Sequence, residues 1–222
     1  MQVFRDAKAS GDLPETVGIQ NTTNASQMHA IRNTGIVHVI TGFTQISGTS
    51  ADGITESILD GREMVFRVVD AYRKHIPGFE NAFVVGVADN LGVRWARRIS
   101  GPSQFPGGQA GLRAKDVIGR AVGWNNVVKH PGKDAWSMQV CHEDNFDIPL
   151  SCLLPEKVEG LIMGAGRSVN TRGTGDLRVM AHTMVVGQGA GVSAAVAARN
   201  DTVPRHVSVS AVQEELMRQG AL

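Results

Sequence analysis

A long helix with a stripe of small side chains fills much of the C-terminal third, and it restricts the possible folds more than any other feature. The helix is expected to begin near Val179 or His182 and to continue to about Asn200. The small residues along it are Gly187, Gly191, Ala194, Ala195 and Ala198. Small side chains let a helix backbone lie close to a neighbour. We therefore expect this stripe to pack against another helix, a sheet or a flat cofactor.

The segments before this helix alternate between extended runs and glycine-rich turns. Ile148–Pro155 is an extended run, and Pro149 places it at the edge or entry of a sheet. Gly160–Gly164 predicts a short buried strand, and a loop rich in glycine and threonine follows from Gly166 to Gly175. The C-terminal part therefore predicts a strand, a loop and a helix in that order.

The N-terminal part mixes strands with one long helix. Ile36–Ile40 is β-branched and apolar, so it predicts a strand. Apolar residues recur at helical spacing from about Thr55, and Pro77-Gly78 supplies the stop. Ala82–Ala88 and Val93–Ile99 predict the two strands of a hairpin. These elements indicate an antiparallel sheet beside a long amphipathic helix.

Gly101–Gly111 is a loop or hinge, because its prolines and glycines prevent a continuous helix or central strand. A short helical patch is expected after it. The whole pattern predicts an α+β fold with an antiparallel sheet, helices, and a partial α/β layer at the C-terminus. We divide the chain into residues 1–147 and residues 148–222.

Composition excludes several classes of partner. Lysine and arginine total 22 against 21 acids, a formal charge of +1, so no basic surface for nucleic acid or an anionic membrane is expected. No run approaches the roughly 18 apolar residues of a spanning helix. The two cysteines, Cys141 and Cys152, are too few for a disulfide framework. We expect a cytoplasmic protein whose partner is another protein or a small molecule.

His142 stands beside Cys141, Glu143 and Asp144, a cluster that suggests either acid–base chemistry or a metal site. Consecutive residues of an extended chain point in opposite directions, so at most alternating members of the cluster can converge on one ion, and no metal is expected. His142 as a proton donor to substrate is the better hypothesis. A surface loop histidine is the alternative.

Other polar residues have structural alternatives to a functional role. Arg94 and Arg98 share one face of the predicted strand, with Arg97 on the other. They could bind a carboxylate, or they could form a solvated face with salt bridges. His38 and His182 are expected to be satisfied structurally within a strand and a helix.

The sequence from Leu153 to Ala198 resembles the closing segment of the FAD-dependent oxidoreductases in the glutathione-reductase-like flavoprotein superfamily. Order and spacing carry the resemblance, and no single motif is specific. The matching C-terminal motifs are Ile148-Pro149, Leu154-Pro155, Gly164–Arg167, Leu177–Met180 and Gly187–Gly191. The matching upstream motifs are Gly61-Arg62, Pro77–Glu80, Leu91–Arg94, Arg97–Ile99 and Gly101.

This resemblance implies an enzyme that uses FAD for hydride transfer on a small organic substrate. It also implies that residues 1–147, with the antiparallel sheet, form a substrate or cap domain portion and that residues 148–222 form the C-terminal part of an FAD-binding domain. The implied cofactor-binding residues are Gly164, Gly166, Arg167, Asp176, Leu177, Arg178, Val179 and Met180. The free N–H groups and partial positive charge of a helix N-terminus suit the electron-rich N1–C2=O2 edge of a reduced flavin. Arg178 would lie near the flavin or an anionic substrate, or it would serve as a buried structural anchor.

The chain departs from the family pattern at the nucleotide end. Such enzymes open with a strand, a G-x-G-x-x-G turn and a helix, and neither Gly164–Gly166 nor Gly187–Gly191 begins such a unit. The chain is therefore expected to be incomplete without an N-terminal FAD-binding segment, which another subunit could supply, or to self-associate. Asn170–Arg172 stands where members often carry a histidine or an acid, so the resemblance does not define the substrate chemistry. The alternative is a non-catalytic remnant or ligand-binding subunit without its own FAD.

Overall fold

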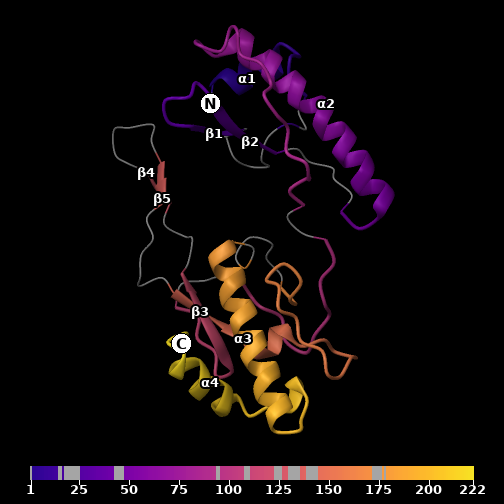
Figure 1. Cartoon of the computed structure of the whole chain (residues 1–222), viewed down its shortest axis with the longest axis vertical. Coiled ribbons are helices and arrows are strands. Elements are labelled where there is room, and N and C mark those ends of the chain that lie inside the picture. Colours follow the sequence, from indigo (N-terminus) through magenta and orange to yellow (C-terminus); the bar gives the residue numbers. More distant parts are fainter. Residues whose placement is uncertain are drawn as a thin grey trace. The chain divides into compact units, whose positions relative to one another are not determined.

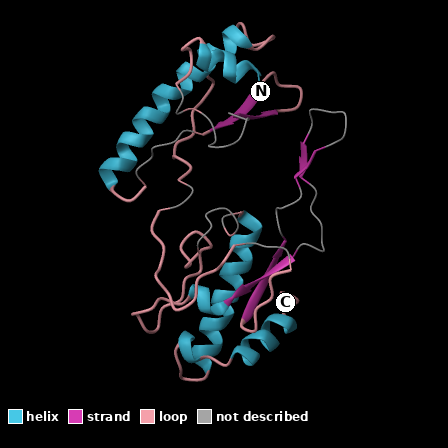
Figure 2. Cartoon of the chain, turned by 180° about the vertical axis from the view of Figure 1, so that it is seen from behind, coloured by secondary structure: helices cyan, strands magenta, loops and turns pink. Residues whose placement is uncertain are grey.

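The computed structural model describes most of the chain, in two compact units, Met1–Val93 and Arg94–Leu222 (Figure 1). The described residues are 2–14, 17, 26–42, 48–93, 96–107, 111–122, 127–129, 136–138, 145–171, 177 and 179–222. Helices and small antiparallel sheets both occur, which confirms the mixed α+β class (Figure 2). The assignment of residues 1–147 and 148–222 to two functional domains stays a prediction.

The first unit contains helix α1 (Gln2–Ala9), the antiparallel strands β1 (Ser26–Ala30) and β2 (Val37–Thr41), and helix α2 (Ala51–His75). Strand β2 confirms the strand predicted at Ile36–Ile40, shifted by one residue. The core residues of this unit are Ala7, Leu13, Val17, Val68, Ala71 and Tyr72. His38 lies in strand β2, as expected, and is exposed, with its ring beside that of His29.

Helix α2 begins four residues before the predicted start at Thr55. The hydroxyl oxygen of Ser50 accepts a hydrogen bond from the Gly53 N–H at 3.1 Å and so caps the helix. The helix ends at His75, before Pro77-Gly78, as predicted. Gly78 has a φ of +91°, a conformation that glycine adopts without a steric cost.

The hairpin predicted at Ala82–Ala88 and Val93–Ile99 is wrong, since residues 82–93 and 96–99 contain no strand. Phe83 and Val85 are 73% and 70% exposed, so this apolar run lacks the buried face that would stabilise a sheet. The Ile99 N–H instead donates to the Ser168 carbonyl at 2.9 Å. This backbone hydrogen bond lies within the second unit, to which both Ile99 and Ser168 belong.

The second unit is built on the antiparallel pair β3 (Val117–Val122) and β6 (Asn145–Pro149). Strands β4 (Val127–Lys129) and β5 (Trp136–Met138) form a separate pair. Helices α3 (Met180–Arg199) and α4 (Val209–Arg218) both contact β3 (Figures 1 and 2). The short 3-10 helices η1 and η2 cover Leu150–Leu153 and Pro204–His206.

Several expectations for this unit need correction. Strand β3 occupies the segment where a short helical patch was predicted after Gly111. The extended run from Ile148 is a strand only to Pro149 and then forms η1. Gly160–Gly164 is not a strand, because only a single backbone hydrogen bond, from the Met163 N–H to the Leu153 carbonyl at 2.9 Å, is seen on it among the described residues.

Helix α3 confirms the predicted C-terminal helix, but its buried side is not the predicted stripe. Gly191, Ala195 and Ala198 are exposed. The residues that α3 buries are His182, Val186, Gly189, Ala190, Val192, Ser193, Val196 and Ala197. Apolar side chains lie on every side of this helix, so the sequence gives no amphipathic pattern that identifies the packed side.

Candidate functional site

The segment from Leu161 to Gly166 lies along helix α3. The Gly164 carbonyl oxygen would be 3.5 Å from a Cβ placed on Gly187. A Cβ placed on Gly164 would be 3.8 Å from the Ala190 Cβ. A Cβ at either position would make an ordinary van der Waals contact, so the segment lies close to the helix but does not require glycine at these two positions.

Gly166 makes the tightest backbone contact in this region. A Cβ on this residue would overlap the Leu177 carbonyl oxygen, so only glycine fits there without a shift of the chain. The same Leu177 carbonyl accepts a hydrogen bond from the Thr183 hydroxyl at 3.0 Å. Leu177 is thus held between the glycine turn and the first turn of α3.

The N-terminus of α3 has no side-chain cap. The N-cap residue is Val179, which makes no capping hydrogen bond, and the first turn contains no acidic residue. Met180 and Met184, one turn apart, are 79% and 71% exposed. The helix start therefore combines donor N–H groups, a partial positive charge and apolar side chains.

The loop that leads toward this helix is held by backbone hydrogen bonds. The Asn170 side chain donates from Nδ2 to the carbonyls of Gly101 and Ser103 at 3.1 and 2.9 Å. The Asn170 backbone joins two further segments, through Phe105 N–H to its carbonyl at 2.8 Å and through its own N–H to Cys152 O at 3.0 Å. The loop is therefore fixed on both sides up to Thr171.

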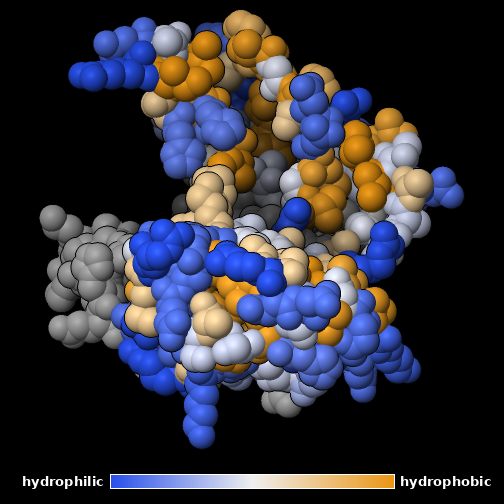
Figure 3. Space-filling view, turned by 60° about the horizontal axis from the view of Figure 1, so that its bottom comes forward, coloured by the Kyte–Doolittle hydropathy of each residue, from blue (hydrophilic) through white to orange (hydrophobic). Residues whose placement is uncertain are grey.

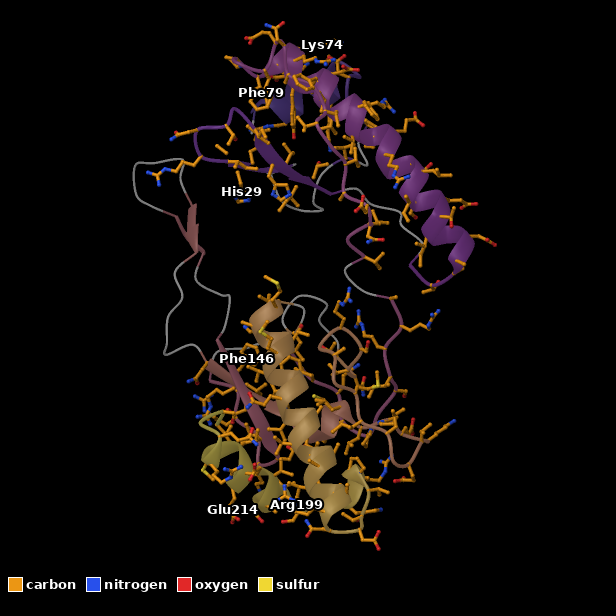
Figure 4. The ribbon with its side chains drawn as sticks, viewed as in Figure 1. His29, Lys74, Phe79, Phe146, Arg199 and Glu214 are labelled. Carbon is orange, nitrogen blue, oxygen red and sulfur yellow. The ribbon has the colours of Figure 1, made fainter. Side chains whose placement is uncertain are left out.

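The sheet below α3 sets the position of the helix. A Cβ on Gly189 would lie 2.5 Å from the Ile118 carbonyl oxygen of β3, so the helix and strand backbones are very close. His182 is buried with its ring edge against Phe146 of β6, at 5.7 Å between centroids and 85° (Figure 4). This aromatic contact confirms the expected structural role of His182.

Two carboxylates brace the strands beside this core. Buried Asp147 accepts hydrogen bonds from Arg120 Nε at 2.8 Å and from the Ala114 N–H at 3.1 Å. Asp116 accepts from the Ser151 N–H at 2.8 Å. Burial, with the negative charge of Asp116 as a second cause, raises the pKa of the Cys152 thiol to about 12. Cys152 is therefore a buried structural thiol rather than a nucleophile.

Of the predicted cofactor residues, the structure brings Gly166 into contact with Leu177, which is hydrogen-bonded to the first turn of α3 that Val179 and Met180 begin. Gly164 lies further along α3, beside Gly187 and Ala190. Arg167 is exposed at the end of the glycine turn. The predicted residues that lie outside the described residues are Asp176, Arg178 and the cluster Cys141–Asp144, with His142. Arg94 also lies outside them, and Arg98 donates from Nη1 to the Thr171 carbonyl at 2.8 Å.

A second feature lies at the other end of α3. A shallow groove of about 330 Å³ is lined by Val196, Arg199, Asn200, Ala211, Glu214, Glu215 and Arg218 (Figure 4). Hydrogen bonds from Arg218 and then Gln219 lower the pKa of Glu215 to about 2. Arg218 forms an ion pair with Glu215 at 2.6 Å within this groove. Helix α3, with 20 residues, separates the groove from Met180 by roughly 30 Å. The groove is separate from the glycine turn.

In the part of the chain that the structure describes, no three histidine, cysteine or acidic side chains converge as a metal-binding group. No described helix has the length and apolar content that a bilayer crossing requires. Charged and apolar side chains are interspersed on the surface of both units (Figure 3).

A family model described as FAD dependent oxidoreductase matches residues 3–216. The match covers nearly the whole sequence, so the chain belongs to the FAD dependent oxidoreductase family. The cofactor of this family is FAD, and its general activity is flavin-dependent oxidation and reduction. No curated protein and no solved structure matches the chain.

Proposed function

We propose that this chain forms the substrate-facing and flavin-closing part of an FAD-dependent oxidoreductase that acts on a small organic substrate. The family match across residues 3–216 carries the proposal. The contact of Gly166 with Leu177, and the hydrogen bond that joins Leu177 to Thr183 in the first turn of α3, support it, because they hold the glycine turn beside the helix start.

The described residues fit the flavin end of FAD in their donor chemistry. The uncapped first turn of α3 offers N–H groups to the N1–C2=O2 edge, and no acidic side chain in that turn opposes an electron-rich ligand. Gly164 and Gly166 keep the backbone free of side chains, and exposed Met180 supplies an apolar surface for the ring. Bound FAD supplies two-electron hydride chemistry.

We assign the remaining predicted residues by their chemistry. Arg167 and Arg178 provide positive charge for the flavin or an anionic substrate group, and Asp176 provides a hydrogen-bond acceptor on the same loop. His142 holds the proton that substrate accepts or releases. Residues 1–147 then form the substrate portion and residues 148–222 the flavin-facing portion.

The adenosine pyrophosphate needs a second site. The sequence contains no strand–G-x-G-x-x-G–helix unit, and the pyrophosphate of a dinucleotide normally lies on such a turn and helix N-terminus. We propose that an N-terminal FAD-domain subunit, or a second copy of this chain, completes the enzyme. The buried free thiol of Cys152 is consistent with a reducing compartment, and we propose the cytoplasm.

The flavin contact is tested with Arg178→Ala in the assembled, FAD-containing protein. We expect weaker FAD retention or a shifted flavin absorbance spectrum. Arg199→Ala, at the far end of α3, is the matched control and should retain the wild-type flavin content. Wild-type content and spectrum in the Arg178 variant would contradict the assignment.

The need for a partner is tested by titrating FAD into the isolated, monodisperse chain. We expect weak or no binding, since contacts at the flavin edge leave the nucleotide end in solvent. A stoichiometric, submicromolar complex formed by a monomer would refute the partner requirement. An assembled protein that binds a small ligand but never carries flavin would favour the non-catalytic alternative.

A further inference from the structure

Two histidines stand directly opposite each other on the β1–β2 hairpin. The antiparallel register pairs His29 with His38, and their ring centroids are 6.2 Å apart at an interplanar angle of 32°. The Ile31 N–H donates to the Ile36 carbonyl at 2.9 Å, so Ile31 and Ile36 form a hydrogen-bonded pair. The two pair types alternate along an antiparallel ladder, and the histidine pair lies two residues further along each strand, so it is also of the hydrogen-bonded type. The Cα atoms of such a pair are about 5.5 Å apart.

Both imidazoles point to the solvent side of the hairpin. Val39 packs against the core of the first unit, and alternation along the strand therefore sends its neighbour His38 to the opposite face. His29 and His38 are both exposed (Figure 4, where His29 is labelled). Neither ring makes a hydrogen bond or an ion pair with another described residue, so its nitrogen atoms are accessible to an ion from solution.

We propose that His29 and His38 together bind one divalent transition-metal ion. Imidazole nitrogen is a preferred ligand of Cu²⁺, Ni²⁺ and Zn²⁺. When two imidazole rings bind the same ion through metal–nitrogen bonds of about 2.0–2.1 Å, their ring centroids are about 5 Å apart. The rings must approach by roughly 1 Å, which exposed side chains achieve by small rotations about χ1 and χ2.

The site has two protein ligands, and water or a small anion completes the coordination. It therefore binds an exchangeable ion, and Cu²⁺ binds more tightly than Ni²⁺ or Zn²⁺. The ion joins strand β1 to strand β2 and fixes their register. Because it binds only the folded hairpin with both ligands, it also raises the stability of the first unit.

The test is a titration of the untagged full chain with Cu²⁺, followed by electron paramagnetic resonance for nitrogen ligands and by thermal unfolding. We expect one ion per chain, and we expect His29→Gln or His38→Gln to weaken binding by about tenfold or more through loss of the second, intramolecular ligand. His206→Gln removes an exposed histidine of the other unit and should leave the affinity unchanged. Circular dichroism checks that each exposed substitution preserves the fold.

Moving the histidine pair to another position of the hairpin tests whether the cross-strand arrangement itself binds the metal ion. Gln27 and Ile40 are also directly opposite and have the same type of pairing as His29 and His38. Introducing Gln27→His and Ile40→His into the variant that lacks both native ligands should restore binding of one Cu²⁺. Binding in the doubly substituted His29→Gln, His38→Gln chain at wild-type affinity would overturn the proposal, as would an absence of Cu²⁺ binding by the wild type.

Discussion

Two glycines of α3 provide a direct test of how this helix packs on the sheet. Gly189 is buried, and a Cβ there would lie 2.5 Å from the Ile118 carbonyl oxygen and 2.7 Å from its Cδ1. Gly191, two residues further along the same helix, is exposed, and a Cβ there would meet nothing within 4 Å. Gly189→Ala and Gly191→Ala therefore add the same methyl group to the same helix and differ only in what that methyl group contacts.

The expected magnitudes follow from this difference. Replacing glycine by alanine inside a helix stabilises it by about 1 kcal/mol, and this gain applies at both positions. At Gly189 the added methyl group also forces α3 away from β3, which costs about 1–3 kcal/mol. Gly191→Ala should thus raise the free energy of unfolding by about 1 kcal/mol, and Gly189→Ala should fall about 1–3 kcal/mol below it.

Urea unfolding followed by circular dichroism measures both free energies of unfolding, with the m-value as a check that the denatured states match. The order of the two variants is the decisive result. If Gly189→Ala is as stable as Gly191→Ala, or more so, then α3 does not approach β3 as closely as the structure has it. The expectation that Gly191 belongs to the packed stripe would predict the reverse order.

Three further predictions test other parts of the chain. Gly166→Ala should lower the free energy of unfolding by about 1–3 kcal/mol, because its methyl group would displace the Leu177 carbonyl; unchanged urea unfolding would contradict the contact. Hydrogen bonds from Lys74 and then His75 lower the pKa of the Asp12 carboxyl, so it contributes stability that is fully present above its unfolded value of about 3.9 and is lost as pH falls below that value. Asp12→Asn should therefore be less stable than wild type at pH 7 and show a flatter acid transition in thermal unfolding; equal curves would refute the role. The Cys152 thiol, with its pKa raised to about 12, should escape alkylation at pH 8 in the native protein and react after denaturation, as mass spectrometry of the peptides can show.

The helices were predicted best, because their signals are local. Apolar residues at helical spacing and the Pro77-Gly78 stop identified α2 in the sequence, and a missed signal, the Ser50 cap, explains the error at its start. The family resemblance likewise depended on local motifs in fixed order, and the match to residues 3–216 confirms it.

The strands were predicted less well, because a strand depends on its partner. The run at Ala82–Ala88 is as apolar as many strands, yet no described segment pairs with it. Strand β3 was missed because Gly119 and Arg120 interrupt its apolar residues, and its identity comes from β6, about 25 residues away in the sequence. Pairing over such distances does not follow from the composition of either strand alone.

The candidate site could be predicted as a set of motifs but not as a surface. Glycines before the last helix suggested a close backbone approach, and Gly166 makes one with Leu177. Which side of α3 is buried depends instead on β3, which provides the carbonyl against Gly189. The buried side of α3 could therefore not be predicted without β3, a strand that was missed in the sequence.

The residues at the start of α3 are not the ones that would stabilise the helix best as caps. A serine or aspartate in place of Val179 would stabilise the helix by about 1 kcal/mol, and an acid in the first turn would add about 0.3–1 kcal/mol. The sequence has neither, and it exposes Met180 and Met184 beside the first N–H groups of the helix. An acidic cap would accept hydrogen bonds from those groups and repel an electron-rich ring edge, whereas the valine side chain accepts none and the methionines offer an apolar contact. Under the proposed function, this local loss of stability fits a helix N-terminus that lies against the flavin, and the packing of Gly189 on β3 holds the helix in place without a side-chain cap.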